Sequence, residues 1–203
     1  MALHDTESLQ YLSLDDLLAL DDARIEIMDG AVHDMSPVGV LHHLIAGNIF
    51  RILDAFVLQT GSGTVFMDGL IYLMHSETRG LRHAYVPDVS YIRTASIPGG
   101  WQIAKPFPGV PNLAVEVMSP DDKAEGVEVK VQTYLSKGTE EVWVVFPEAR
   151  TINQHYHSQV ETVRRYSGSM QIDTRVLFPG LELTTSQIFQ LPPWAQQRDD
   201  AQT

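Results

Sequence analysis

Residues 112–118, NLAVEVM, form an apolar strand pattern interrupted by a single acid, Glu116. The SPDD sequence at 119–122 is typical of the start of a helix, and Gly138 would end that helix. A second apolar run, EVWVVF at 141–146, predicts another buried strand. A strand, a helix and a strand in this order indicate an α/β or α+β protein with a mixed central sheet.

The residues before this unit predict a helix, a hairpin and a longer helix. Residues 13–20 favour a short helix, because a serine cap precedes an acidic first turn. The Asp-Gly pair at 29–30 is a strong hairpin turn between strands at 24–28 and 31–35. Apolar residues three and four apart then predict an amphipathic helix over 41–56.

The other expected elements are short. In chain order they are a strand at 64–74, a polar loop at 75–83, a strand at 85–92, a loop at 98–111, a hairpin formed by 152–157 and 160–166, and a short helix at 185–189. We therefore expect one domain over residues 1–190, followed by a loose polar tail at 191–203.

Composition narrows the possible functions. The chain has 203 residues and no cysteine, which excludes disulfides and thiolate chemistry. Its formal net charge of -12 opposes binding of a polyanion over the whole surface. A local basic patch remains open at Arg79, Arg82 and His83, or at Arg164 and Arg165. We read no signal peptide and no membrane span, so we expect a cytoplasmic protein with no membrane partner.

Three charged residues stand in positions that call for an explanation. Asp88 follows Pro87 within an apolar strand pattern, Glu116 interrupts residues 112–118, and Lys130 falls on the helix that follows. A buried charge needs a cation, a metal or a proton. Two carboxylates on adjacent strands would suit a hard cation such as Mg²⁺ or Mn²⁺, and a lysine could orient an attacking water. The alternative is a Pro-Asp at a strand start and a glutamate that faces solvent.

An ordered set of short motifs surrounds these residues. It comprises EIMDG at 26–30, SP at 36–37, PDV at 87–89, AVEVMSP at 114–120, EVKVQTYL at 128–135 and LFPGLEL at 177–183. Together, over roughly residues 11–190, they resemble the Uma2 family of endonucleases in the PD-(D/E)xK nuclease superfamily. The resemblance implies a restriction-endonuclease-like α/β fold, in which helices flank a mixed β-sheet and an N-terminal helix-hairpin extension precedes it.

The resemblance also implies roles for individual residues. Asp88 and Glu116 match the two acids that bind metal, and the backbone carbonyl of Val117 could complete the site. The superfamily lysine is expected where Met118 stands, so its role points to Lys130 on the next helix.

Two further positions, Glu26 and His42, recur in the family. Glu26 could bind a second metal or orient a water. His42 could assist proton transfer or contact phosphate, with packing at a helix start as the alternative. Lys123 competes with Lys130, and Tyr134 is expected in the core.

The resulting prediction is an Mg²⁺- or Mn²⁺-dependent endonuclease that hydrolyses phosphodiester bonds of nucleic acid, DNA first of all, as a homodimer. A non-catalytic binding or scaffold protein that retains the fold is the alternative, and a nuclease for branched, single-stranded or RNA substrates is a third reading. His155 and His157 could pair on zinc, but the sequence offers no third ligand at a convincing spacing.

Overall fold

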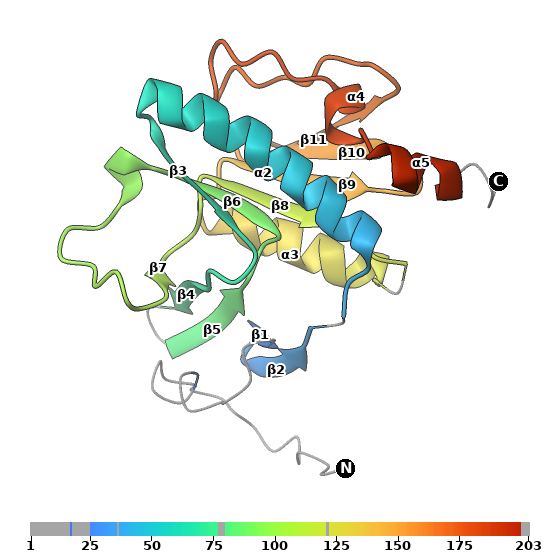
Figure 1. Ribbon diagram of the computed structural model, residues 1–203. Helices are drawn as coiled ribbons and strands as arrows, with labels where there is room; N and C mark the ends of the chain where they lie inside the picture. The colour runs from blue at the N-terminus through green and yellow to red at the C-terminus, as the bar shows by residue number, and fades with distance from the viewer. Residues whose placement is uncertain (1–16, 18–24, 36, 77–79, 121, 200–203) are drawn as a thin grey trace.

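The computed structural model describes residue 17 and residues 25–35, 37–76, 80–120 and 122–199. It has two mixed β-sheets and helices that cover them (Figure 1). The larger sheet has the strand order β11-β10-β9-β8-β6-β3, and the smaller has the order β2-β1-β5-β4-β7. The α/β class is therefore confirmed, with the expected single sheet divided into two.

The larger sheet carries the predicted strand–helix–strand unit at its centre. Its strands are β3 (Gly63–Met67), β6 (Val89–Arg93), β8 (Leu113–Val117), β9 (Glu141–Phe146), β10 (Thr151–Tyr156) and β11 (Gln159–Ser167). Strands β8 and β9 are parallel, and α3 (Ala124–Ser136) connects them, as a crossover between parallel strands requires. The other neighbouring strands of this sheet pair antiparallel.

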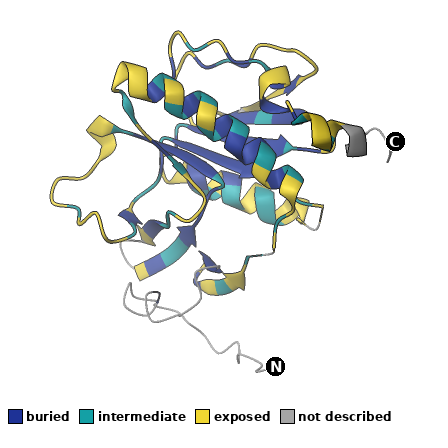
Figure 2. Cartoon of the chain, in the orientation of Figure 1, coloured by how far each residue is buried: buried dark blue, intermediate teal, exposed yellow. Residues whose placement is uncertain are grey.

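Helices lie on both faces of this sheet, and β8 shows why. Leu113, Val115 and Val117 pack in one cluster with the buried residues of α2 (Val40–Thr60). Ala114 packs in another cluster with residues of α3. Because side chains alternate between faces along a strand, Glu116 must share the α3 face with Ala114. The central strands of the larger sheet are mostly buried, whereas the helices that cover them have one buried and one exposed side (Figure 2).

Helix α2 is long and apolar enough to cross a membrane if only length and composition are considered. Its apolar residues, however, include Ile45, Ile49, Leu53 and Val57, which are buried in the core. Helix α2 packs its apolar face against β3, β6 and β8, and it is therefore a core helix.

The smaller sheet contains the predicted hairpin. Its strands are β1 (Ile25–Met28), β2 (Ala31–Asp34), β4 (Tyr72–Ser76), β5 (Gly80–Tyr85) and β7 (Phe107–Pro108). β1 and β2 pair antiparallel around the turn at Asp29 and Gly30, both of which have positive φ. The short helix expected at 13–20 lies outside the described residues except for Leu17, which is buried.

Three sequence predictions between the two sheets were wrong. The expected strand at 64–74 is two strands, because a turn at Asp68 and Gly69 sends β3 into the larger sheet and β4 into the smaller. The expected loop at 75–83 instead contributes to the antiparallel pair of β4 and β5. The expected strand at 85–92 is interrupted at 86–88, where the chain passes from β5 to β6.

Two helix boundaries also differ from the prediction. Helix α3 begins at Ala124 and not at 119–122, because the Asp122 carboxylate accepts a hydrogen bond from the Ser119 N–H at 2.6 Å, which ties Ser119 to Asp122 ahead of the helix. Residues 193–199 form α5 (Pro193–Asp199) where a loose tail was expected. The remaining helices are η1 (Thr94–Ser96) and α4 (Thr185–Ile188), the latter as predicted at 185–189.

Candidate functional site

The segment that connects β5 to β6 holds Asp88 next to β8 through two hydrogen bonds. The Asp88 N–H donates to the Val115 carbonyl at 3.0 Å. The Asp88 Oδ2 accepts the Val117 N–H at 2.6 Å. Pro87 has no N–H to donate, so the residue before Asp88 cannot continue the strand ladder. The carboxylate is thereby held beside the strand that carries Glu116.

Glu116 is only 8% exposed, and two side chains of α3 contact it. Its Oε2 lies 3.1 Å from the Lys130 Nζ, and its Oε1 accepts the Tyr134 hydroxyl at 3.2 Å. Lys130 and Tyr134 are four residues apart, which places both on one face of the helix. The alternative of a solvent-facing glutamate is therefore wrong.

Glu26 reaches the same place from the smaller sheet. Its Oε1 accepts the Val86 N–H at 3.0 Å, and its Oε2 lies 2.7 Å from the Lys130 Nζ. The Lys130 ammonium therefore bridges two carboxylates that come from different sheets. It also lies 5.8 Å from the centroid of the Tyr85 ring, within the range of a cation–π contact.

His42 approaches from the first turn of α2. Its Nε2 lies 3.2 Å from Asp88 Oδ1, and within the described part of the chain its buried Nδ1 has no hydrogen-bond partner. Burial lowers the pKa of His42, but the hydrogen bond and the charge of Asp88 outweigh it, so the net effect is a raised pKa. The neighbouring His43 is exposed, so of these two adjacent histidines only His42 belongs to the site.

The buried charges influence one another strongly. Burial raises the pKa of Glu116 to about 8; Lys130 opposes that shift, while Glu26 and Asp88 add to it. Burial also lowers the pKa of Lys130, but the carboxylates of Glu116 and Glu26 more than offset this, so its pKa is raised overall. Lys130 therefore remains an ammonium at neutral pH, whereas Glu116 can gain or lose a proton there.

A cavity of about 400 Å³ joins these groups. Glu26, His42, Asp88, Glu116 and Lys130 all line it, as does Val117. Lys123, the competitor of Lys130, also lines the cavity from the N-cap of α3 but has no ion pair with these acids among the described contacts. With Asp34 and Asp122 included, five carboxylates face two lysines, a formal charge of -3 if the histidines are neutral.

The donor set fits a hard divalent cation. Carboxylate and carbonyl oxygens are the ligands that Mg²⁺ and Mn²⁺ prefer, and the negative charge of the cavity needs a counter-charge. As they are placed, no three His, Asp or Glu side chains of the described residues stand ready to hold a metal ion. The Lys130 ammonium is paired with Glu116, and the Val117 N–H donates a hydrogen bond to Asp88. Binding of a metal ion by these two carboxylates would therefore require both contacts to adjust.

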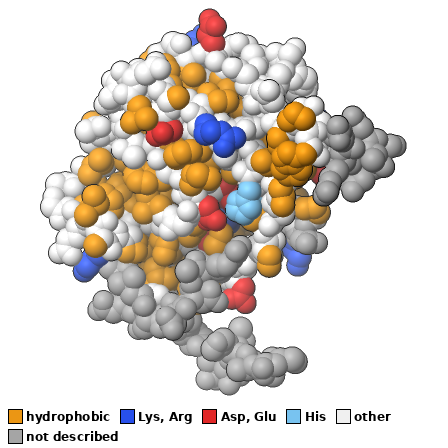
Figure 3. All heavy atoms as spheres, viewed as in Figure 1, with side chains coloured by type: hydrophobic (Ala, Val, Ile, Leu, Met, Phe, Trp, Pro, Cys, Tyr) orange, Lys and Arg blue, Asp and Glu red, His pale blue; other side chains and the backbone are white. Residues whose placement is uncertain are grey.

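The basic residues considered in the sequence do not gather at this cavity. Arg82 pairs with Asp29 and Arg164 with Asp173. Arg164 lies on β11, three strands from β8 in the sheet order. Arg79 lies outside the described residues. On the described surface of the face in Figure 3, Lys and Arg appear as isolated groups.

The possible zinc pair also receives no support. The His157 Nδ1 lies 2.7 Å from the Leu135 carbonyl, and His155 is buried. Within the described chain, no third acid or histidine joins them as a metal cluster. Tyr134, by contrast, was expected only in the core, and its hydrogen bond to Glu116 was missed. Its spacing of four residues from Lys130 was the signal that could have revealed it.

Comparisons with known proteins agree with this architecture. The model of the Uma2 family, described as "Putative restriction endonuclease", matches residues 10–186. A solved structure from Anabaena variabilis ATCC 29413, titled as a putative nuclease belonging to DUF820, superimposes with a TM-score of 0.74 at 19% sequence identity. The match covers 88% of this chain and 97% of that one, which shows a shared fold. A search of curated proteins found no match.

Proposed function

The chain belongs to the Uma2 family, and from that premise we propose that it is a metal-dependent endonuclease that hydrolyses phosphodiester bonds of nucleic acid, with DNA as the first substrate to test. One observation carries this proposal. Two acids on neighbouring segments, Asp88 and Glu116, face a single cavity together with a buried lysine, Lys130. That combination provides oxygen ligands for a cation and a fixed positive charge beside them.

Each residue has a distinct part in the proposed reaction. Asp88, Glu116 and the Val117 carbonyl would hold Mg²⁺ or Mn²⁺, which when bound supplies a Lewis acid and lowers the pKa of water. Lys130 orients the attacking water and offsets the negative charge that develops on the phosphate. Glu26 holds the Lys130 ammonium at 2.7 Å.

His42 also takes part in the proposed reaction. Its Nε2 lies 3.2 Å from the Asp88 carboxylate and holds that carboxylate in place beside β8. A raised pKa favours the protonated ring, which suits contact with a phosphate or transfer of a proton to the leaving oxygen.

The proposal includes a homodimer that acts in the cytoplasm. A second copy of the chain would supply a second cavity, so that both strands of a locally unpaired nucleic acid could be cut in one encounter. A protein of net charge -12 gains little from long-range attraction to DNA, so assembly on the substrate would have to come from local contacts.

A non-catalytic binding protein is the competing function, and the charge of the cavity favours it. Five carboxylates line the cavity, and the described residues supply only Lys123 and Lys130 against them. A phosphate would be repelled from such a site unless a cation were present. The two functions therefore differ in their response to Mg²⁺.

A cleavage assay separates the two functions. Wild-type protein is incubated with single-stranded, duplex and branched DNA in Mg²⁺ or Mn²⁺, beside Asp88→Asn. Asp68→Asn is the matched control, because Asp68 is an exposed acid in a turn between the sheets. We expect cleavage by the wild type and by Asp68→Asn that a chelator abolishes, and none by Asp88→Asn. Equal background in all three proteins would overturn the nuclease proposal.

A further inference from the structure

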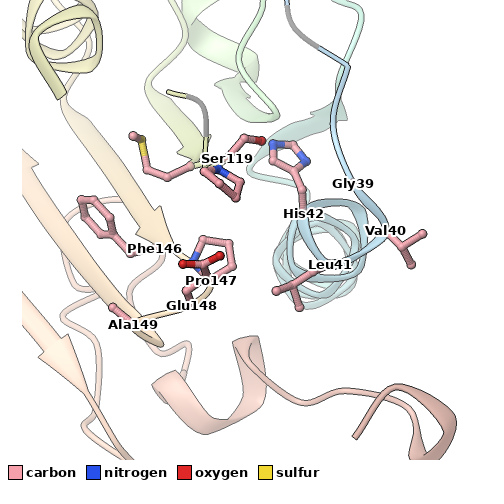
Figure 4. A pocket seen from close by; sticks show the side chains of 11 residues that line it. Gly39, Val40, Leu41, His42, Ser119, Phe146, Pro147, Glu148 and Ala149 are labelled. Atoms are coloured by element: carbon pink, nitrogen blue, oxygen red, sulfur yellow. The ribbon is translucent and has the colours of Figure 1, made fainter. Parts of the chain in front are cut away.

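A second pocket, of about 450 Å³, opens beside the candidate site. It is lined by the first turn of α2, the segment after β8 and the end of β9 (Figure 4). His42, Met118 and Ser119 line both this pocket and the site cavity. A ligand in this pocket would therefore lie next to any group bound at Asp88 and Glu116.

The walls of the pocket are mostly apolar. Leu41 and Met118 contribute flexible aliphatic groups, and Phe146 contributes a half-buried aromatic ring. Pro120 and Pro147 add two rigid rings. In Figure 4, Leu41 and His42 lie across the pocket from Phe146 and Pro147. The volume lies in the range of pockets that take small ligands, and the ring makes a flat aromatic ligand favourable.

The polar groups of this pocket are those that suit a nucleobase edge and not a phosphate. Among the described residues of the lining, Glu148 is the only charged side chain apart from His42, and none of these residues is a lysine or arginine. A carboxylate repels phosphate but accepts hydrogen bonds from the exocyclic amino groups of bases. The Ser119 hydroxyl can donate or accept at the opening shared with the site cavity.

We propose that this pocket, named here the base pocket, receives one unstacked nucleobase of the substrate, whose phosphate lies in the adjoining site cavity. The inference rests on the proposed function and deepens it by naming a substrate class. A base inside a stacked duplex cannot reach a pocket of this kind, so the substrate is single-stranded or locally unpaired nucleic acid. Stacking on Phe146 then provides affinity that the acidic protein cannot obtain from phosphate contacts.

Binding, measured without cleavage, tests this inference. Fluorescence anisotropy in Ca²⁺ compares a labelled single strand of about 12 nucleotides, the same strand with abasic residues, and a hairpin duplex of the same composition. The normal strand is expected to bind about tenfold more tightly than either of the others, as one stacked base would provide. Equal affinity for the normal and abasic strands, or tighter binding of the duplex, would overturn the inference.

A filled pocket provides the second measurement. Ala149→Trp places an indole in the lining from an exposed position, and Leu58→Trp is the matched control at the far end of α2, where the side chain is 75% exposed. Ala149→Trp is expected to remove the preference for the normal strand, and Leu58→Trp to retain it. Retention of the preference in Ala149→Trp would place the base elsewhere and overturn the base pocket.

The base pocket and the nuclease activity can fail separately. A base-dependent preference that Ala149→Trp abolishes, in a protein that cleaves nothing in Mg²⁺, would support the base pocket and contradict the nuclease. Cleavage that depends on Asp88 but is equal for duplex, normal and abasic strands would support the nuclease and overturn the base pocket.

Discussion

Lys130 joins two acids that come from different parts of the fold. Its Nζ lies 2.7 Å from Glu26 in the smaller sheet and 3.1 Å from Glu116 in the larger. Without the ammonium, two carboxylates would face each other in a largely buried cavity. A broken buried ion pair is far more costly than a missing surface pair, because the remaining charge has no water to stabilise it.

We expect Lys130→Met to lower both stability and activity. The free energy of unfolding should fall by about 3 kcal/mol at pH 8. The loss should stay nearly constant between pH 8 and pH 5 and grow above pH 8, because removal of Lys130 raises the pKa of Glu116 beyond its value of about 8, so that Glu116 is protonated in the folded variant at both pH values. Urea unfolding at several pH values tests this. The control is Lys137→Met, which replaces an exposed lysine at the C-cap of the same helix, and a loss that grows toward pH 5 would contradict this prediction.

Tyr134 provides a residue-scale test of positioning. We expect Tyr134→Phe to lower the cleavage rate about tenfold while the protein stays folded, because Glu116 loses a donor worth about 1–2 kcal/mol. Tyr72→Phe is the control, since Tyr72 is equally buried but donates to Ser90 instead. Similar rates for the two variants in single-turnover cleavage would show that the bond to Glu116 has no catalytic value.

Some residues of the candidate site could be identified from the local sequence, and others could not. Asp88, Glu116 and Lys130 could be singled out because a charge inside an apolar pattern must find a partner, and the structure brings all three to one cavity. The contact of Glu26 with Lys130 required knowledge that the smaller sheet lies against α3, which no local pattern contains. Tyr134 looked like an ordinary core residue, because its hydroxyl is only one atom of a largely apolar side chain.

Strands β8 and β9 position the site, and a second polar network stabilises the same sheet. Glu141, at the start of β9, is fully buried. Its Oε2 accepts hydrogen bonds from the Trp143 Nε1 at 3.0 Å and the Gln154 Nε2 at 2.7 Å. Burial raises the pKa of Glu141 to about 7, and these two hydrogen bonds oppose the shift. The carboxyl is therefore partly protonated near neutral pH.

This network makes the stability of the sheet depend on pH. A folded-state pKa above the unfolded value means that Glu141 contributes its full stability at low pH and loses it as the pH rises through about 7. Between pH 5 and pH 8 the wild type should lose about 2–3 kcal/mol relative to Glu141→Gln, since each pKa unit corresponds to about 1.4 kcal/mol. Unfolding in urea measures this difference, and parallel pH profiles of the two proteins would contradict it.

The spacing of apolar residues predicted where strands and helices lie better than it predicted which sheet each strand joins. The strands at 112–118 and 141–146 and the helix over 41–56 were confirmed, because each has a long, regular apolar pattern. The stretch at 64–74 has an equally strand-like composition, but Asp68 and Gly69 divide it between two sheets. Whether a short turn separates strands of one sheet or of two depends on tertiary contacts that a linear pattern does not contain.

The whole molecule is acidic, with a formal net charge of -12. Nucleic-acid binding that relies on phosphate neutralisation weakens steeply with salt, in proportion to the number of phosphates contacted. The described arginines near the edges, such as Arg82 and Arg164, are already paired with Asp29 and Asp173. The protein should therefore contact few phosphates.

Because the protein should contact few phosphates, its affinity for nucleic acid should depend weakly on salt. The slope of log affinity against log salt for a single strand should be shallower than about -3, as for a protein that neutralises only a few phosphates. Anisotropy titrations at constant Ca²⁺ and varied KCl measure the slope. A slope near -6 or steeper would reveal an extended basic surface and contradict the account of binding.

We propose that Asp88 and Glu116 hold a divalent cation beside Lys130 in one catalytic cavity. Crystals of the wild type and of Asp88→Asn, soaked in Mn²⁺ in the same way, can be compared by anomalous diffraction. We expect an anomalous peak bonded to carboxylate oxygens of Asp88 and Glu116 in the wild type, and its loss in the variant. The absence of a peak from that cavity, with the Lys130 ammonium still bound to Glu116, would contradict it.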